Sequence, residues 1–551
     1  MTLLAGAAIF CFYAVVYPYH LHFQEQYQLF EFTWAYFGSL AAIPGGVADW
    51  LGRFLTQLFY YAPLGAACMA LLLVGIQLLT WACCRNRTLL TYALSFLPVV
   101  LLLAFYADEN ALAGAAVALA LALAASALCR KQILLVPVLY WLCGPLAVVY
   151  VLVTAIWEGK RPWIWLFLLV ILVLCPLISA RLVPYPLARL FQGVHYYRYH
   201  NILPVLLWLG ALGAVAVVLV SAFKGQEKWL PGLATFAGLA CLGVFLTLRS
   251  ADMVKEEWMR YDFMVRMKMW NRIMMTADKK NPRNPKTVSC LNLALGKTGR
   301  LPDSQFSYYQ NGPEGLIPSY VGDYTNPVST SEIFWHLGMV NTAQRYAFEA
   351  QEAIPDFQKS ARLYRRLAET NIVNGDWDVA RKYLKALQHT LFYRQWAKET
   401  LSLLDEDRIF EVREELEQAR DQRLKEHDFL FSDTEMDSML GLLHVENPGN
   451  DLALDYLMAW CLLTKNLDRF VECIHLVTVP VMPKSYQEAL LLRWVQTHSD
   501  FTGLPPYLAP AHAQRISRFV ADMQAGKSEE AMRRQYGDTY WFYYYYRYRH
   551  E

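Results

Sequence analysis

Residues 18–60 contain the polar side chains of the first half of the chain whose types and spacing best suit chemistry. Glu25 follows the first apolar run, and a carboxylate in that position could deprotonate an acceptor hydroxyl. Glu25 is therefore the candidate catalytic residue. The alternative is that Glu25 only caps or orients the loop in which it lies.

The candidate ligand-binding residues are polar side chains that lie close to apolar runs. Some flank Glu25, and others are spaced by four residues in a predicted amphipathic helix, residues 47–59, that follows a Pro-Gly-Gly turn. The rest belong to a basic, tyrosine-rich stretch, residues 181–201, that could hold lipid phosphate, although the bias toward basic cytoplasmic loops accounts for these residues by itself and is the preferred interpretation. These candidates are His20, His22, Gln26, Asp49, Arg53, Gln57, Arg189 and Arg198.

Several other chemistries are disfavoured by the sequence. His20, His22 and Glu25 are residue types that bind divalent metals, but their spacing is weak evidence and no metal site is predicted. Phosphate-binding loops and the common hydrolase motifs are missing, which argues against an ATPase or a common hydrolase. The near absence of charges within the apolar runs disfavours an ion-coupled transporter. A formal net charge of +2 gives no case for nucleic-acid binding.

The apolar runs that surround these candidates predict a membrane-spanning helical bundle. Hydrophobic residues make up 56% of the chain, more than is usual for a soluble protein, and the long apolar runs lie in residues 1–250. A helix needs about 20 apolar residues to cross the hydrocarbon core of a bilayer. We predict about eight spans, over residues 2–17, 61–84, 88–106, 110–129, 133–157, 162–180, 202–222 and 230–249.

Basic residues in alternate loops predict the orientation of this bundle. Arg85 and Arg87, Arg130 and Lys131, and the stretch 181–201 are basic without acidic neighbours, which places these loops in the cytoplasm. The N-terminus is then cytoplasmic and residues 18–60 face outward. An even number of spans would also place residues 251–551 in the cytoplasm, and an odd number would place them outside.

The second half of the chain has the pattern of a soluble helical domain. Residues 251–330 predict a connecting helix and an irregular linker, and residues 331–551 predict helical hairpins that stack into a solenoid. Solenoids of this kind present extended binding surfaces, so we expect a protein partner. The clearest hairpin resembles the tetratricopeptide repeat at Tyr364, Leu367, Ala368, Ala380 and Leu384.

A resemblance to known families rests on residues 25–30, on Pro44-Gly45-Gly46 and on residues 51–57. They resemble an uncharacterised bacterial family of polytopic membrane proteins with a C-terminal tetratricopeptide-like domain. The first outer loop is also similar to that of the GT-C membrane glycosyltransferases. That likeness implies a helical bundle that transfers a sugar from a polyprenyl-phosphate carrier, with an acidic residue after the first span as base or metal partner. Glu25 occupies that position, but those enzymes commonly use Asp and carry their soluble domain outside.

The sequence therefore predicts an all-α, multi-pass protein of the bacterial inner membrane with two alternative functions. In the first, the bundle contacts the lipid bilayer and anchors a protein-binding helical-repeat domain that serves cell-envelope biogenesis. In the second, the protein is a GT-C-like glycosyltransferase with Glu25 as the acid or base. Only the second function would require a divalent metal and a polyprenyl-phosphate sugar.

Overall fold

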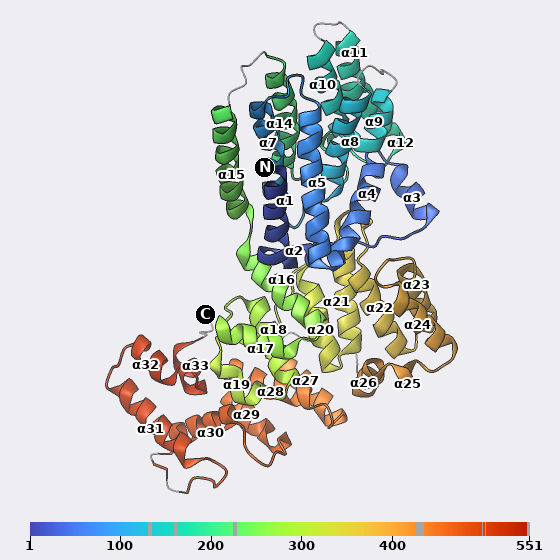
Figure 1. Cartoon of the computed structure of the whole chain (residues 1–551). Helices are drawn as coiled ribbons and strands as arrows, with labels where there is room; N and C mark the ends of the chain where they lie inside the picture. Colours follow the sequence, from blue (N-terminus) through green and yellow to red (C-terminus); the bar gives the residue numbers. More distant parts are fainter. Residues whose placement is uncertain are drawn as a thin grey trace. The chain divides into compact units, whose positions relative to one another are not determined.

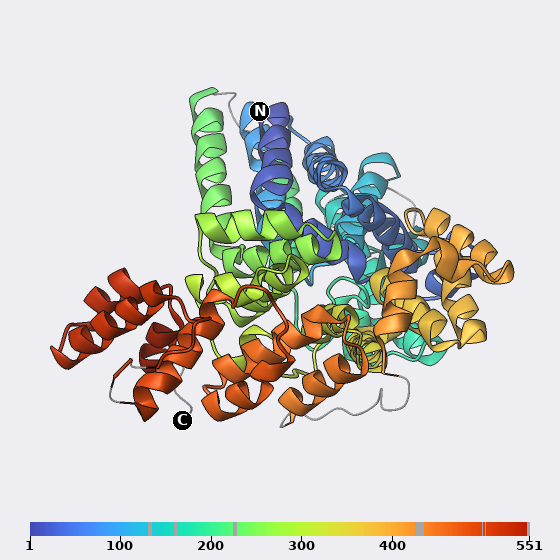
Figure 2. The ribbon, with the colours of Figure 1, turned by 90° about the horizontal axis from the view of Figure 1, so that it is seen from below.

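A computed structural model describes residues 1–129, 135–158, 163–223, 229–424, 435–498, 500–501 and 503–547. Every regular element in these ranges is a helix, apart from one isolated β-bridge between Ala111 and Tyr197 (Figures 1 and 2). The predicted all-α fold is therefore confirmed for the described part of the chain. The predicted basic loop at Arg130 and Lys131 lies outside the described residues.

The chain divides into two compact units. Unit 1 contains residues 1–256 together with two short segments from the second half, residues 355–362 and 385–398. Unit 2 contains residues 257–354, 363–384 and 399–551. The domain boundaries predicted near residues 250 and 330 stay predictions.

Unit 1 is a bundle of apolar helices joined to several short ones. Its helices are α1 (Thr2–Cys11), α2 (Pro18–Gln26), α3 (Trp34–Ala41), α4 (Gly46–Gln57), α5 (Ala62–Ala82), α6 (Leu89–Leu94), α7 (Leu97–Phe105), α8 (Gly114–Leu128), α9 (Leu135–Cys143), α10 (Val148–Glu158), α11 (Trp163–Leu169), α12 (Cys175–Leu182), α13 (Leu187–Gln192), α14 (Val205–Ser221) and α15 (Trp229–Ser250).

Fewer helices are long enough to cross a membrane than the sequence predicts. Three qualify by length and composition, at Ala62–Ala82, Leu135–Glu158 and Trp229–Ser250, and a fourth is added if Thr2–Val16 and Pro18–Gln26 form one bent span. The prediction of eight spans is therefore wrong. The predicted spans 88–106, 110–129, 162–180 and 202–222 are apolar helices of 10–17 residues. At 1.5 Å per residue, such helices reach at most about 25 Å, less than the roughly 30 Å hydrocarbon core.

Proline explains the bend after the first apolar helix. Pro18 begins α2, and the preceding Tyr17 leaves the helical region with φ −132° and ψ 44°. A residue before proline is disfavoured in the α conformation, and proline has no N–H to continue the hydrogen-bond ladder. The axis of α2 consequently turns by 76° from that of the first helix.

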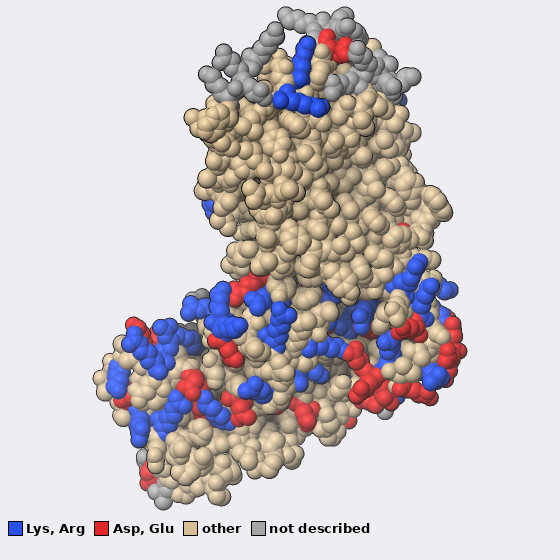
Figure 3. Space-filling model, viewed as in Figure 1, with Lys and Arg blue, Asp and Glu red and all other residues tan. Residues whose placement is uncertain are grey.

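Small residues set the close packing between α4 and α8. A Cβ atom on Gly52 of α4 would lie 2.2 Å from the backbone nitrogen of Gly114, the first residue of α8. Ala115, Ala118 and Ala122 on α8 are fully buried. On the side of unit 1 drawn in Figure 3, charged side chains are scarce along the apolar helices, as expected for surfaces that face lipid.

Unit 2 consists of helices in sequence. They are α16 (Met253–Arg266, which begins in unit 1), α17 (Trp270–Lys279), α18 (Pro285–Lys297), α19 (Leu301–Ser304), α20 (Asn326–Leu337), α21 (Val340–Ala353), α22 (Ala361–Asn374), α23 (Trp377–Leu387), α24 (Arg394–Asp405), α25 (Ile409–Val412), α26 (Glu414–Gln422), α27 (Met436–Glu446), α28 (Asp451–Leu463), α29 (Leu467–Cys473), α30 (Lys484–Thr497), α31 (Pro510–Gln524), α32 (Glu529–Tyr536) and α33 (Tyr540–Tyr546), of which α22, α23 and α24 have ends that belong to unit 1.

Consecutive helices of unit 2 pack against each other in pairs, such as α20 with α21 and α27 with α28. The likeness to tetratricopeptide repeats stays a prediction. Most side chains of the aromatic C-terminal helix α33 are buried within this unit. Trp541 donates to the Glu488 carbonyl at 2.7 Å, and the Tyr543 hydroxyl donates to the Leu463 carbonyl at 2.7 Å.

Candidate functional site

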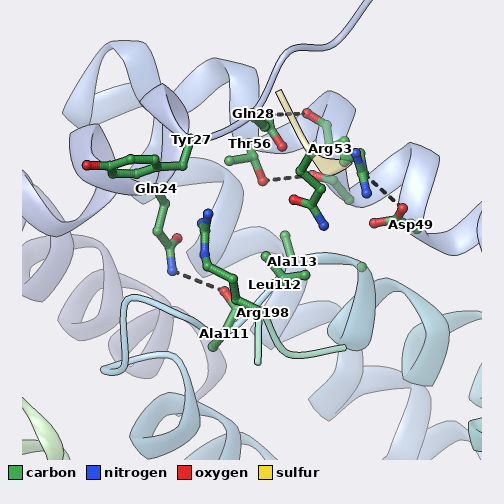
Figure 4. Close-up of a pocket in the computed structure, with 13 residues that line it drawn as sticks. Gln24, Tyr27, Gln28, Asp49, Arg53, Thr56, Ala111, Leu112, Ala113 and Arg198 are labelled. Atoms are coloured by element: carbon green, nitrogen blue, oxygen red, sulfur yellow. Dashed lines mark hydrogen bonds and ion pairs between the residues drawn. The ribbon is translucent and has the colours of Figure 1, made fainter. Parts of the chain in front are cut away.

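A polar pocket lies in unit 1 where several apolar helices end (Figure 4). It encloses about 370 Å³, part of it open to solvent. Its lining comes from the end of α2, from α4, from the loop between α7 and α8, and from residues far along the chain. The lining residues are Gln24, Tyr27, Gln28, Asp49, Gly52, Arg53, Thr56, Ala111, Leu112, Ala113, Gly114, Arg198 and Gln358.

Helix α4 begins at a turn that only glycine accommodates. Gly45 has the left-handed φ of 82°, and a Cβ atom on Gly46 would lie 1.7 Å from the Leu40 carbonyl oxygen. The predicted turn at Pro44-Gly45-Gly46 and the amphipathic helix that follows are therefore confirmed. The turn fixes the direction of α4 and with it the position of Asp49, one turn into the helix.

Asp49 and Arg53 form a nearly buried ion pair on α4. Arg53 Nε donates to Asp49 Oδ2 at 2.8 Å, and the two side chains are 12% and 3% exposed. Arg53 also lies 3.4 Å from the Tyr36 hydroxyl. Burial lowers the pKa of Arg53, but the Asp49 carboxylate and the Tyr36 hydroxyl raise it more, so its pKa stays above the ordinary value. The guanidinium therefore keeps its charge although water is mostly excluded.

Arg198 reaches the pocket through the isolated β-bridge. Its backbone N–H donates to the Asn110 carbonyl at 2.9 Å, beside the bridge between Ala111 and Tyr197. The side chain is only 2% exposed, and its guanidinium carbon lies 5.4 Å from the centre of the Tyr27 ring. A cation over an aromatic face is stabilised electrostatically when water is excluded.

The strap segment, residues 355–362, adds Gln358 to the pocket from the second half of the sequence. Its end is held by α2: Arg362 donates to the Gln26 side-chain oxygen at 2.8 Å, and the Ser360 hydroxyl donates to the Gln26 carbonyl. The Ala361 N–H donates to the Gln28 carbonyl at 3.3 Å. The strap therefore closes one side of the pocket within unit 1.

A buried ion pair holds the start of the strap. The Arg189 guanidinium binds both carboxylate oxygens of Asp356, and the two side chains are 8% and 11% exposed. Arg189 also donates to the Val194 carbonyl at 3.2 Å, and its guanidinium carbon lies 5.2 Å from the Tyr185 ring centre. Bidentate pairing of this kind fixes geometry as well as charge.

Three of the candidate residues named from the sequence meet in the pocket: Asp49, Arg53 and Arg198. The ring of His20 instead stacks on Tyr17, with centroids 4.7 Å apart. Within the described part of the chain, the candidates that do not line the pocket are Glu25, His20, His22, Gln26, Gln57 and Arg189.

Two of these remaining candidates, Gln26 and Arg189, act by holding the strap. Glu25 is buried at 4% exposure, and its catalytic role stays a prediction. Among the described residues, no group of three or more His, Cys, Asp or Glu side chains is arranged to hold a metal ion.

Several lining residues were missed by the sequence reasoning. Gln24, Tyr27 and Gln28 follow a three- and four-residue spacing that could have marked a common side. Gln24 donates to the Ala111 carbonyl at 3.1 Å, and Gln28 donates to the Arg53 carbonyl at 2.7 Å. Gln358 had no detectable signal, because nothing local in the sequence links it to residues more than 300 positions earlier.

The charges of this pocket suit an anionic ligand. Two guanidinium groups and one carboxylate line it, and amide side chains supply further donors. A guanidinium presents donors in a fork that matches the oxygens of phosphate or carboxylate. Arg53 and Arg198 are the two cations that line the pocket, and Arg53 is paired with Asp49.

The model of a family of unknown function (DUF6057) matches residues 1–547. No curated protein and no solved structure matches the chain.

Proposed function

The chain belongs to this family of unknown function, DUF6057, and from its own site we propose that it is a membrane protein that binds the phosphate head group of a lipid carrier. The observation that carries the proposal is a pair of guanidinium groups, the buried Arg198 and the nearly buried Arg53, in one pocket beside the ends of apolar helices. A lipid carrier would place its chain along those helices and its head group in the pocket.

The finer proposal is that the bound carrier donates a sugar, as in the GT-C enzymes. The order of elements supports it: a bent first apolar helix, the short helices α3 and α4, and then the apolar α5. Glu25 would accept the proton of the acceptor hydroxyl, and Arg198 would bind the phosphate that leaves with the carrier. Asp49 is the carboxylate that lines the pocket, so it is the second candidate for the base or for a divalent metal ligand.

A second candidate function is that of a membrane anchor for a protein-binding domain in the bacterial cell envelope. The helix pairs of unit 2, such as α20 with α21, favour it because stacked pairs present continuous surfaces to a partner. A reporter fused after Asn281 would determine on which side of the membrane the second half lies. An outer location would favour the enzyme, and a cytoplasmic location would favour the anchor.

The proposed function is tested by lipid binding to the detergent-solubilised full chain. We expect a polyprenyl phosphate to bind more tightly than the matching polyprenol, with affinities measured by native mass spectrometry. Arg198→Gln should weaken binding of the phosphate at least tenfold, because a charge-assisted hydrogen bond contributes about 1.5–3 kcal/mol. Equal affinity for phosphate and alcohol would contradict the proposal.

Arg249→Gln is the matched control. Arg249 is an exposed arginine at the end of α15 in the same unit and does not line the pocket. Its variant should bind the phosphate within about twofold of the wild type, a difference well below the 1.4 kcal/mol that a tenfold change represents. The glycosyltransferase step is tested separately with Glu25→Gln, which should still bind the carrier and should lose sugar transfer; retained transfer would leave Asp49 as the candidate base.

A further inference from the structure

Unit 2 contains a second pocket that is separate from the lipid-carrier site. It encloses about 450 Å³, part of it open to solvent, and it lies among α17, α18, α20 and α26. Its walls are two tryptophans and three basic side chains, together with polar side chains of α26. The aromatic and basic residues are Lys268, Trp270, Lys297, Trp335 and His336.

Two backbone positions with positive φ shape this pocket. Lys268 has a φ of 54° where the chain turns from α16 into α17, and this turn brings Trp270 to the wall. Gly338 ends α20 with a φ of 87°. A Cβ atom there would lie 3.0 Å from Gln422, so glycine lets the end of α26 approach.

The two lysines of the pocket differ in their partners. Lys268 forms an ion pair with Glu415 of α26. Within the described part of the chain, Lys297 forms neither a hydrogen bond nor an ion pair, although it is only partly exposed. Burial lowers the pKa of Lys297, and no carboxylate of the described residues offsets that effect. A partly buried ammonium without a counter-ion is costly, and an anion from solution would relieve that cost.

The electrostatic surroundings of His336 also favour an anionic ligand. Burial lowers the pKa of His336 to about 3, and the charges of Lys297, Arg366 and Lys268 lower it against the opposing effect of Glu332. Its imidazole is therefore neutral at pH 7, in a region of positive potential. The ring offers a hydrogen bond to a ligand without adding a charge.

The tryptophans supply flat surfaces next to these cations. Arg366 covers Trp335, with its guanidinium carbon 4.3 Å from the ring centre, and donates to Glu332 at 2.6 Å. Trp270 contacts His336 edge to face, with centroids 5.3 Å apart at 82°. Among the described residues, neither indole N–H has a hydrogen-bond partner. Aromatic walls of this kind prefer stacked or edge-on rings.

We propose that this pocket binds a small ligand in which a carboxylate or phosphate is attached to an aromatic ring. The anionic group would bind the Lys297 ammonium, and the ring would lie against Trp270 and Trp335. The indole N–H groups and the neutral imidazole would supply the remaining hydrogen bonds. This site does not depend on the lipid-carrier function of unit 1.

Isothermal titration calorimetry on the detergent-solubilised full chain tests the proposal with simple probes. Benzoate and phenyl phosphate combine the ring with the anion, inorganic phosphate has the anion alone, and benzyl alcohol has the ring alone. We expect at least one of the two aromatic anions to bind with a Kd of about 1 mM or below, and at least tenfold more tightly than either single-feature probe. Absence of measurable binding of both aromatic anions, or equal binding of inorganic phosphate, would overturn the proposal.

Variants in the pocket separate binding from folding. Lys297→Gln should weaken binding of the aromatic anion at least tenfold. Lys297→Arg should keep most of the wild-type affinity, because arginine retains the positive charge. Trp270→Leu should weaken binding of the aromatic anion and leave the affinity for inorganic phosphate unchanged. Lys279→Gln, on the exposed end of α17, is the matched control and should bind like the wild type. Unchanged affinity in Lys297→Gln, with a melting temperature equal to that of the wild type, would contradict the assignment.

Discussion

The ion pairs beside the pocket of unit 1 are more buried than most ion pairs among the described residues of unit 2, where those of Arg366 are the buried exception. In unit 1, the pairs Asp49–Arg53 and Arg189–Asp356 are nearly buried, with exposures between 3% and 12%. In unit 2, pairs such as Arg381–Asp378 lie on the surface, where Asp378 is 97% exposed. The drawn side of unit 2 in Figure 3 is correspondingly mixed in both signs of charge.

This difference shows which charges constrain the structure. An apolar unit cannot leave a buried charge without a partner, so each of its buried pairs fixes a geometry, and both of the pairs named above lie at the pocket or hold its strap. A surface pair gains little in water and constrains little. In unit 2 the charge that indicates a ligand site is Lys297, which is partly buried and has no counter-ion among the described residues.

Breaking the strap pair should have the largest effect. Asp356→Asn keeps the side-chain size and tolerates the left-handed φ of 63° at this position, but removes the charge that Arg189 needs. Removing one partner of a buried pair costs about 3–5 kcal/mol. We expect a loss of this size in urea unfolding of the detergent-solubilised protein, together with weaker binding of the polyprenyl phosphate. Stability equal to that of the wild type would show that the strap is not held by charge.

A buried carboxylate in unit 2 should produce the next largest effect, as a dependence on pH. Glu488 accepts the Tyr540 N–H at 2.8 Å. Burial raises its pKa to about 7, against the opposing effects of Lys484 and of that hydrogen bond. Because the folded state binds the proton more tightly than the unfolded chain, the stabilisation is complete at low pH. It is lost as the pH rises from about 4.5 through about 7.

Glu488→Gln removes this titration and keeps an acceptor for Tyr540. The wild type should lose about 3 kcal/mol relative to the variant between about pH 4 and about pH 8, measured by urea unfolding. The exposed Glu530→Gln serves as the control and should follow the wild type at every pH. Parallel curves for the wild type and Glu488→Gln would contradict the role of burial.

Overpacking the contact between α4 and α8 should have an intermediate effect on unit 1. In Gly52→Ala, the new methyl group would lie 2.2 Å from the Gly114 nitrogen, so the two helices must separate. We expect a loss of about 1–3 kcal/mol. Since both glycines line the pocket, binding of the polyprenyl phosphate should weaken as well. Gly238→Ala on α15 has open space for its methyl group and should leave both measurements unchanged.

The smallest effect is expected for a surface pair of unit 2. Asp378→Asn removes a carboxylate that lies 3.4 Å from Arg381 in water. Exposed pairs contribute between 0 and about 1 kcal/mol, so the change in urea unfolding should stay within about 0.5 kcal/mol. A loss comparable to that of Asp356→Asn would remove the contrast between the two units.

Local patterns in the sequence determined the helical class, the amphipathic α4 and the spacing that pairs Asp49 with Arg53. These follow from helical periodicity and from the left-handed turn at Gly45, which depend on neighbours in the chain. The span count failed because hydropathy counts apolar residues and does not measure helix length, so stretches such as 202–222 passed although the helix in it is short.

Only the tertiary structure decided which of these residues form a site. Arg198 reaches the pocket through a bridge to Ala111, and Gln358 and Asp356 arrive from the other half of the sequence. Contacts between distant segments depend on how whole helices pack, and packing leaves no periodic trace in the sequence near either partner. The pocket in unit 2 was missed for the same reason, because Lys297 and Trp335 belong to helices that are unremarkable one at a time.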